Sequence, residues 1–572
     1  MKLRLCFILV FSSSFFSGMY AFAGRYTTLI PRSASVNAAR ELVGWYDGIN
    51  LCCQDDNYWS LSFNPTYNRS YHNDQIECFL LGKDYFRITG SRVAGRGSDE
   101  ILADYFGLPS DFQGSVCFAP RISTFLFDFD WFWGLDRWLP GLYFRAHAPV
   151  VHTIWDLNIR EKVAVAGSLN FPAGYMGSER IARSTLPTSL KGVMDNNINP
   201  VTFGDMKDPI AYGKLLMRQA RSRFSDVQVA LGYNVCCSED MHAGINLRGS
   251  IPAGSKPDPT VLFDPVIGNG HHAEFGVGLS GHVTPWMNED ETDYFGIYSD
   301  LNITHLFKDT QCRSFDLCAN GRGSRYTLLE RFFSSESSGV HVDGEAITTQ
   351  YQGCLVPAIN VTTVPIEVSF PVQVDFVLMF VYHRFCDLDI NWGYNLWFRS
   401  AETLHCRERL CANTYAVKGD AQVYGFDSNA PLKLSATQSR ATIFGGQSGG
   451  NFAGTLYAND NADNPMQADN TSDVPLTQLN SSDSAAFEIA QANVQTSLSA
   501  RLLTDSDINE SSGLMPRALS HKVFVNVGRV WRERVREPFV GVGAELEWRC
   551  RCVGDNSAVS QWGIWIKGGF TS

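Results

Sequence analysis

Apolar and polar residues alternate along most of the chain, which is the pattern of β-strands with one apolar and one polar face. Every second residue is apolar between Asp226 and Val235, and after a short polar turn the alternation resumes from Met241 to Ile251. Successive side chains of a strand point to opposite faces of the sheet, so these two runs predict a β-hairpin. Similar runs lie at 59–67, 116–122, 125–135, 142–150, 272–283, 295–307, 368–380, 387–399, 523–531, 540–549 and 560–570.

Two all-β architectures share this alternation. A secreted β-sandwich packs its apolar faces against each other, whereas a transmembrane β-barrel presents them to lipid. The runs have the length of tilted membrane strands, and their polar faces are rich in Gly, Asn, Asp, Arg and Glu. Aromatic residues at the ends of runs indicate an interfacial girdle; they include Trp131, Trp133, Trp138, Trp392, Trp397 and Trp562. We therefore predict an all-β fold, an antiparallel transmembrane β-barrel of about 14–18 strands with short helical insertions.

The chain divides into an export signal, a short N-terminal segment and the barrel. Residues 1–23 have a positive start, a mostly apolar stretch and a small-x-small site at Ala21-Phe22-Ala23, so we predict a signal peptide. Residues 24–57 precede the first clear run and are a candidate plug of the lumen. The barrel is expected to cover 58–572, with a polar insertion at about 427–519. The formal net charge of −12 argues against nucleic acid as a partner.

Cysteine is frequent for a barrel, with 15 in the chain. An exported chain meets an oxidising compartment, so disulfides are expected. None of the cysteines forms the C-x-x-C pattern of zinc ribbons or thioredoxin chemistry. Neighbouring cysteines do not readily bridge each other, so each would bond to another loop or another chain. The candidates are Cys52, Cys53, Cys236, Cys237, Cys312, Cys318, Cys406, Cys411, Cys550 and Cys552.

Three short motifs match catalytic or ligand-binding patterns, but their surroundings favour simpler interpretations. G-x-S-x-G at 446–450 is not followed by the helix that a nucleophile elbow requires. G-x-G-x-x-A at 268–273 opens an alternating run, so it predicts a hairpin turn and not a dinucleotide site. His271, His272 and Glu274 could ligate a metal, although polar residues at a barrel mouth explain them as well. We predict no enzymatic activity, no metal site and no cofactor.

Five blocks resemble a known class of proteins. They are ADYFGL at 103–108, GLYF at 141–144, NGHH at 269–272, NITHLF at 302–307 and SHKVF at 520–524. With the alternating design, they resemble the porin-like outer-membrane β-barrels of Gram-negative envelopes, and more narrowly an uncharacterised family of barrels from host-associated bacteria. The resemblance implies a location in the cell outer membrane with lipid as a partner, and it implies no particular substrate.

The expected function is a porin-like passive channel for small hydrophilic solutes, because a barrel of this size leaves an interior wider than its own side chains fill. The alternative is a cysteine-cross-linked structural or adhesive envelope protein without transport activity. A homo-oligomer is compatible with both. Charged residues on the polar faces would line the pore: Arg121, Arg145, Arg248, Glu274, Asp375, Asp387, Asp389, Arg399, Glu545 and Glu547. Carboxylates outnumber arginines among them, which predicts a weak preference for cations.

Overall fold

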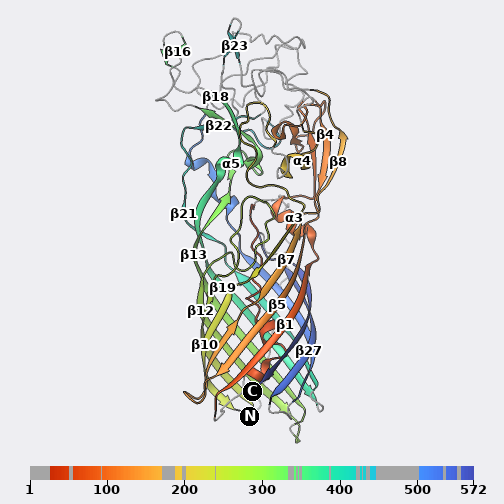
Figure 1. Ribbon diagram of the computed structural model, residues 1–572, viewed down its shortest axis with the longest axis vertical. Helices are drawn as coiled ribbons and strands as arrows, with labels where there is room; N and C mark the ends of the chain where they lie inside the picture. Colours follow the sequence, from red (N-terminus) through yellow and green to blue (C-terminus); the bar gives the residue numbers. More distant parts are fainter. Residues whose placement is uncertain are drawn as a thin grey trace, which may run out of the picture.

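The structure is a computed structural model, and it describes two linked regions of the chain, a barrel and an external region beyond one end of it (Figure 1). The described residues are 26–49, 56–169, 187–195, 201–332, 341–342, 345–346, 351–384, 388–419, 425–427, 430–432, 439–445, 501–531, 536–549 and 555–572, apart from 92, 239 and 291. The predicted signal peptide, the G-x-S-x-G motif and most of the polar insertion therefore lie outside the described residues.

Twelve antiparallel strands close into the barrel. The first strand, β1, pairs with both β5 and the last strand, β28, and this double pairing closes the sheet. Two of the twelve are interrupted, because β6 is followed in line by β7, and β9 by β10. The bounds are β1 Tyr58–Ser70, β5 Arg121–Gly134, β6 Leu142–His147, β7 Val150–Asp156, β9 Arg218–Phe224, β10 Val227–Ser238, β11 Met241–Ile251, β12 Glu274–Met287, β13 Tyr294–Ser314, β19 Thr363–Arg384, β20 Leu388–Arg399, β26 Ala518–Val530, β27 Glu537–Arg549 and β28 Gln561–Thr571.

The predicted fold class is confirmed, but the predicted number of strands is too high. A period-two run identifies a strand without saying which sheet the strand joins. The run at 116–122 illustrates this, because β4 (Gln113–Cys117) belongs to a small external sheet and β5 begins only at Arg121.

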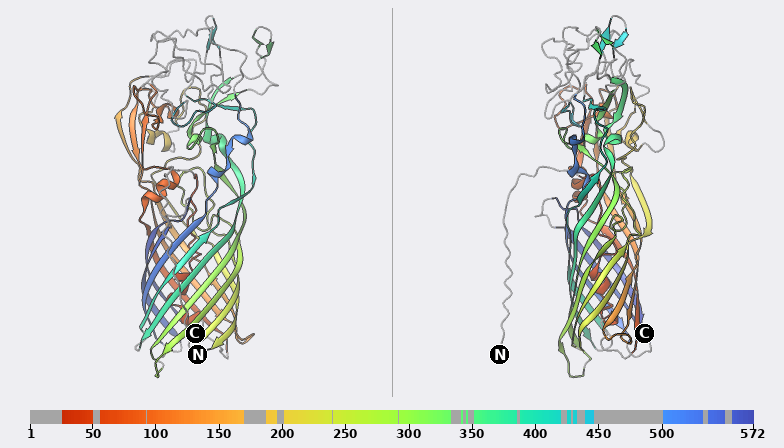
Figure 2. Two further views of the ribbon diagram at one scale, coloured as in Figure 1. Left: turned by 180° about the vertical axis from the view of Figure 1, so that it is seen from behind. Right: turned by 90° about the vertical axis from the view of Figure 1, so that its left-hand side faces the viewer.

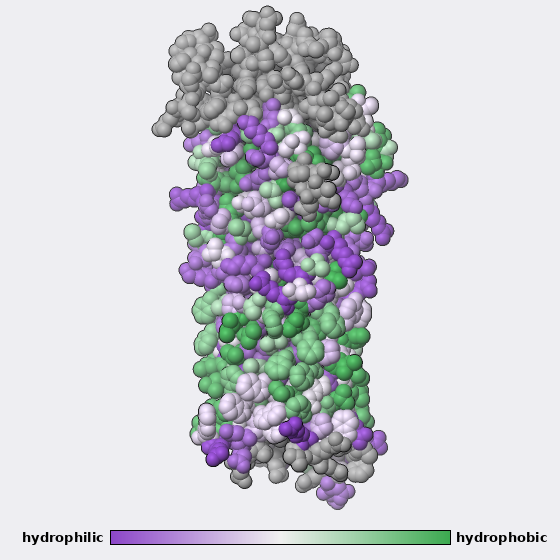
Figure 3. All heavy atoms as spheres, in the orientation of Figure 1, coloured by the Kyte–Doolittle hydropathy of each residue, from purple (hydrophilic) through white to green (hydrophobic). Residues whose placement is uncertain are grey.

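The outer surface of the barrel is apolar and its inner surface is polar. Side chains of the apolar faces are exposed, for example Leu231 at 52% and Leu247 at 53%. They form a hydrophobic belt around the barrel, with hydrophilic surface above it (Figure 3). A closed sheet has no unpaired backbone edge, and an apolar belt on such a sheet matches lipid, not water. The protein is therefore an outer-membrane β-barrel, as the alternation predicts.

The aromatic girdle is reproduced in part. Trp138 and Trp392 are exposed on the outer surface near the end of the barrel with the short turns. Trp397 is only 1% exposed and faces the lumen, which corrects its assignment to the girdle. Its neighbours explain the error, because Leu396 and Phe398 occupy the outward positions of β20, so the aromatic ring at 397 falls on the inner face.

The two ends of the barrel differ in the length of their connections. Short turns, such as the one between β10 and β11, lie at the end where the last strand finishes, whereas connections such as 71–120, 315–362 and 400–517 lie at the opposite end. Short turns are periplasmic and long loops extracellular in outer-membrane barrels. The external region therefore stands on the extracellular side. Among the described residues, no helix is long and apolar enough to cross a membrane.

The external region contains short helices and small sheets around a common apolar core. One sheet has the order β3-β2-β4-β8 and another β18-β15-β22. Its elements are α3 Asn73–Leu80, β2 Tyr85–Thr89, β3 Ile101–Leu102, η1 Ala103–Phe106, β4 Gln113–Cys117, β8 Arg160–Val165, α4 Leu190–Asp195, β14 Asp316–Leu317, η3 Ser324–Tyr326, β15 Leu328–Phe332, β16 His341–Val342, β17 Glu345–Ala346, β18 Tyr351–Pro357, α5 Ala358–Thr362, β21 Thr403–Arg407, β22 Tyr415–Val417, β23 Gly425–Asp427, β24 Ala430–Leu432, η5 Asp505–Asp507, β25 Ile508–Asn509 and α7 Glu510–Gly513. The core joins α3, α4 and these sheets, so the external region is a packed unit and not a set of separate loops.

The N-terminal segment, residues 26–49, lies inside the barrel (Figure 2). It contains two short helices, α1 (Ala38–Leu42) and α2 (Tyr46–Ile49). Leu42, Trp45 and Tyr46 are buried against inward-facing side chains of the wall, among them Phe132 and Met379. The segment therefore fills space that the wall encloses.

Candidate functional site

The first helix of the N-terminal segment is held at both ends by the barrel. At its start the Asn37 side chain accepts a hydrogen bond from the Arg40 N–H at 3.3 Å, and the Ala38 N–H donates to Asp375 of β19 at 2.7 Å. At its end Lys567 of β28 donates to the carbonyl oxygens of Arg40 and Glu41, at 2.7 and 2.9 Å. An isolated helix of five residues is unstable in water, so the wall provides the order of this one.

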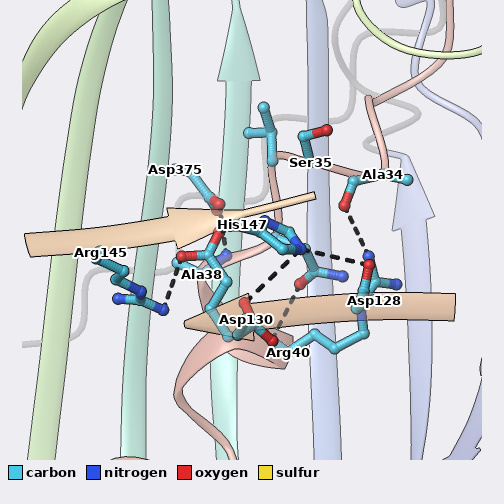
Figure 4. A network of polar contacts seen from close by, with 12 residues as sticks. Ala34, Ser35, Ala38, Arg40, Asp128, Asp130, Arg145, His147 and Asp375 are labelled. Carbon is cyan, nitrogen blue, oxygen red and sulfur yellow. Dashed lines mark hydrogen bonds and ion pairs between the residues drawn. The ribbon is translucent and has the colours of Figure 1, made fainter. Parts of the chain in front are cut away.

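A cluster of buried charges joins α1 to one side of the wall (Figure 4). A carboxylate oxygen of Glu41 lies 2.9 Å from Nη2 of Arg145, 3.8 Å from Nη2 of Arg248, and the other lies 3.6 Å from Nδ1 of His147. Nε of Arg40 lies 2.5 Å from a carboxylate oxygen of Asp128. These six side chains come from α1 and from the strands β5, β6 and β11, so the cluster fixes α1 against a broad part of the wall.

A second cluster joins the preceding residues to the opposite side. Arg32 contacts Asp375 of β19 at 2.8 Å and Glu547 of β27 at 3.4 Å. It also donates to the Asn395 side-chain oxygen at 2.8 Å, and its guanidinium lies 5.8 Å from the ring centre of Trp397. One arginine of the segment therefore connects β19, β20 and β27.

Buried ion pairs of this kind hold the segment against the wall while the lumen is dry. Removing one partner leaves an uncompensated buried charge, which typically costs about 3–5 kcal/mol. Water that enters the lumen can solvate the same charges, however, so the wall does not need the segment once it is wet. The pairs thus hold the segment firmly, and water can take the place of the segment at the same charges when the segment leaves.

Little space remains beside the segment. A cavity of about 70 Å³ is lined by Arg32, Arg40, Leu126 and Trp397, among others, and a second one of about 10 Å³ lies beside Gly44 and Lys567. A water molecule takes up about 30 Å³ in the liquid. These two cavities of the described lumen hold no more than a few water molecules.

Eight of the ten predicted pore residues are buried on the inner face, and each has a partner there. Arg145, Arg248, Asp375 and Glu547 contact the N-terminal segment, as described above, and Arg399 donates to the Ile30 carbonyl of the segment at 2.7 Å. The other three contact further residues of the lumen: Glu545 with Lys522 at 2.8 Å, Asp389 with His383 at 2.5 Å, and Glu274 with Asn269 at 2.6 Å. They are neutralised or hydrogen-bonded within the filled lumen.

The remaining two predicted pore residues have different outcomes. Arg121 is exposed on the outer face, which corrects its assignment to the pore. The reason is that the apolar side chain faces inward at the start of β5, where Ile122 is buried in the core shared with the external region and Arg121 points to the other face. Asp387 lies outside the described residues.

Residues of the segment itself, Arg32, Arg40 and Glu41, were not among the predicted site residues. Asn37 followed by a short apolar and charged stretch is a helix start that the sequence displays, and it could have identified α1. Lys567 was also missed, although parity places it opposite Ile566 and therefore inside. What the sequence does not display is which charges of the segment meet which charges of the wall.

The cysteines and the candidate metal ligands are dispersed. Cys236, Cys312, Cys318, Cys406 and Cys411 are free and exposed thiols, Cys237 is not a free thiol, and Cys52, Cys53, Cys550 and Cys552 lie outside the described residues. His271 contacts Asp309 at 3.8 Å, whereas His272 contacts the Phe307 carbonyl at 2.7 Å and Glu274 contacts Asn269. The three are not brought together. The turn at 268–273 opens β12 and no helix, as predicted.

Comparison with known proteins identifies no family. No family model matches the chain, and no curated protein matches it. Among solved structures it is similar to an outer-membrane channel of Pseudomonas putida F1, with 6% identity, a TM-score of 0.34, and coverage of 91% of this chain and 97% of that one. A FadL homologue of Pseudomonas aeruginosa has 6% identity and a TM-score of 0.27, with coverage of 95% of this chain and 98% of that one. The toluene transporter of Ralstonia pickettii has 6% identity and a TM-score of 0.24, with coverage of 91% of this chain and 90% of that one. These values are too low to indicate a function.

Proposed function

We propose that the protein is a gated outer-membrane channel for small hydrophilic solutes, in which residues 26–49 close the lumen and must move before solute passes. The observation that carries the proposal is the pairing of Arg32, Arg40 and Glu41 with charged residues on several strands of the wall. A passive, permanently open pore, as expected from the sequence, fits a filled lumen less well than a gated one.

The inner face of the wall supports the choice of hydrophilic solutes. Once the segment moves, the wall presents Asp128, Arg145, Arg248, Asp375 and Glu547, which are all buried now. Charged side chains of both signs attract water into such a passage and disfavour an apolar solute. The preference for cations stays a prediction.

Conductance across a planar bilayer tests the proposal. The wild-type chain should conduct rarely, whereas the double variant Arg40→Ala/Glu41→Ala should open more often, because both pairs that fix α1 are lost. The matched control is Arg87→Ala/Glu100→Ala, which removes an ion pair of 3.4 Å in the external region and should behave as wild type. Equal open times for all three chains would contradict the gating role.

The alternative, a cross-linked envelope protein without transport activity, keeps support from one observation. Six thiols are exposed among the described residues, and Cys117, Cys318, Cys406 and Cys411 lie in the external region or next to it. Exposed thiols can form bonds between chains when they are oxidised. Electrophoresis of isolated envelopes with and without reductant tests this role. The role requires high-mass species that reductant dissociates and that are absent from Cys→Ser variants at these positions.

A further inference from the structure

The external region encloses an apolar cavity of about 700 Å³ that the channel proposal does not use. Its walls come from α3, β2, β4, α4 and the loop around η3, and it shares no lining residue with the cavity beside the N-terminal segment. Figure 1 shows α3, β4 and α4 gathered above the barrel, on its extracellular side. Whatever binds there is reached from outside the cell, whether or not the lumen opens.

The size and lining of the cavity distinguish it from a packing defect. Leu80, Ile88, Val116 and Met194 line it, and each is at most 4% exposed. Protein cores contain few voids larger than one water molecule, and an empty apolar void destabilises a fold in proportion to its volume. Pockets that hold small organic ligands are typically about 300–1,000 Å³, mostly apolar, with a few placed polar groups.

The rim of the cavity is polar and open to solvent. Asp84, Asp99 and Gly321 are exposed residues of its lining, whereas the apolar residues lie behind them. A small molecule can therefore enter from the extracellular solution without unfolding the core.

The lining contains a buried ion pair. Arg325 is 3% exposed, and its guanidinium lies 2.9 Å from a carboxylate oxygen of Asp316, which neutralises its charge.

We propose that this cavity binds a small, uncharged, mostly apolar organic molecule. Its apolar body lies among Leu80, Ile88 and Val116. The molecule is uncharged because Asp316 already balances Arg325, so a carboxylate would add an unpaired charge to an apolar site.

A neutral naphthyl ketone dye tests the site, because its emission shifts to the blue in apolar surroundings. The full chain is held in amphipol and titrated with the dye. Val116→Trp and Leu262→Trp fill the cavity from two sides, so that the test survives if one of them fails to fold. Val163→Trp is the matched control, because Val163 is 38% exposed on β8, next to β4 in the same sheet.

Saturable blue-shifted emission is expected from wild type and from Val163→Trp, with affinity at least tenfold weaker in the folded cavity-filling variants. Equal emission from all chains would place the dye in the amphipol or on the surface and overturn the site. A second, charged dye tests whether the ligand is uncharged. An analogue that carries a carboxylate should bind at least tenfold more weakly than the neutral dye, and equal affinity would overturn the assignment of an uncharged ligand.

Discussion

Replacing Glu41 by alanine should loosen the N-terminal segment more than any other single change in it. Glu41 is the carboxylate that both Arg145 and Arg248 share, at 2.9 and 3.8 Å. Without it, Arg145 and Arg248 lose the carboxylate that they share, and the pair of Arg40 with Asp128 is the contact with this cluster that α1 keeps. The change leaves the strands themselves untouched, so the barrel should still assemble.

The magnitude follows from the burial of the partners. Loss of one partner of a buried ion pair typically costs about 3–5 kcal/mol. The side chains of Arg145 and Arg248 keep 11% and 10% of their exposure, so water can reach them in part and the low end of the range applies. About 3 kcal/mol corresponds to roughly a 100-fold larger population of the displaced segment.

Hydrogen exchange measured by mass spectrometry reports this population. The Glu41 and Val43 amides donate to the carbonyls of Asn37 and Ala39, each at 3.0 Å, so both should exchange slowly in wild type. In Glu41→Ala the peptide that covers 38–45 should exchange roughly 100-fold faster, while peptides of β26 and β27 stay protected. Glu100→Ala in the external region is the control. Unchanged exchange at 38–45 would refute the argument that buried charge holds the segment.

Three further predictions concern the wall and the external region. Leu231→Arg places a charge on the lipid face and should cost about 2–4 kcal/mol, seen as a lower yield of folded barrel on gels that separate folded from unfolded chains; normal folding would contradict the assigned face. The sequence alone predicts that Gly232→Arg is tolerated as a lumen position, but this variant should also fail to fold, because a Cβ there would lie 2.1 Å from the Tyr143 ring. The same gels test it, with Gly249→Ala as a control that should fold because the space there is less tight. Burial and the nearby Asp84 and Asp74 raise the pKa of Glu77 in α3 from 4.5 to about 7. The folded state then retains this proton longer than the unfolded state, so the stability from Glu77 is complete below pH 4.5 and is lost as the pH rises through 7. Protease resistance of the external region should fall between pH 6 and 8 in wild type and stay constant in Glu77→Gln, and an identical decline in both would exclude this carboxyl.

Alternation was sufficient to predict the strands, their faces and the membrane location, because one buried and one lipid-facing side leave a period of two in the residues themselves. Leu231 and Arg248 could be assigned to opposite faces from parity alone. Arg121 could not, since apolar positions exchange faces within β5: Ile122 points inward near its start, whereas Phe125 and Phe127 point outward farther along.

The site was harder to predict than the barrel. Inward charges such as Arg145 and Glu547 could be found one by one, but their partners Glu41 and Arg32 lie hundreds of residues away or in another element. Pairing of that kind depends on where the segment enters the lumen, and neither periodicity nor spacing records it. The external cavity likewise results from α3, α4 and two sheets meeting, and each of these elements is too short to display a strong pattern.

The contact between Lys567 and α1 also has a consequence for the order in which the protein is built. Lys567 lies on the last strand, which closes the barrel by pairing with the first, and its ammonium group holds the carbonyls of Arg40 and Glu41 near the beginning of the chain. The N-terminal residues are made and exported first, yet this part of their docking site does not exist until the C-terminal strand has arrived. Docking of the segment is thus a late event of assembly. A chain truncated before β28 would lack both the pairing of β1 with β28 that closes the barrel and the contact of Lys567 with α1.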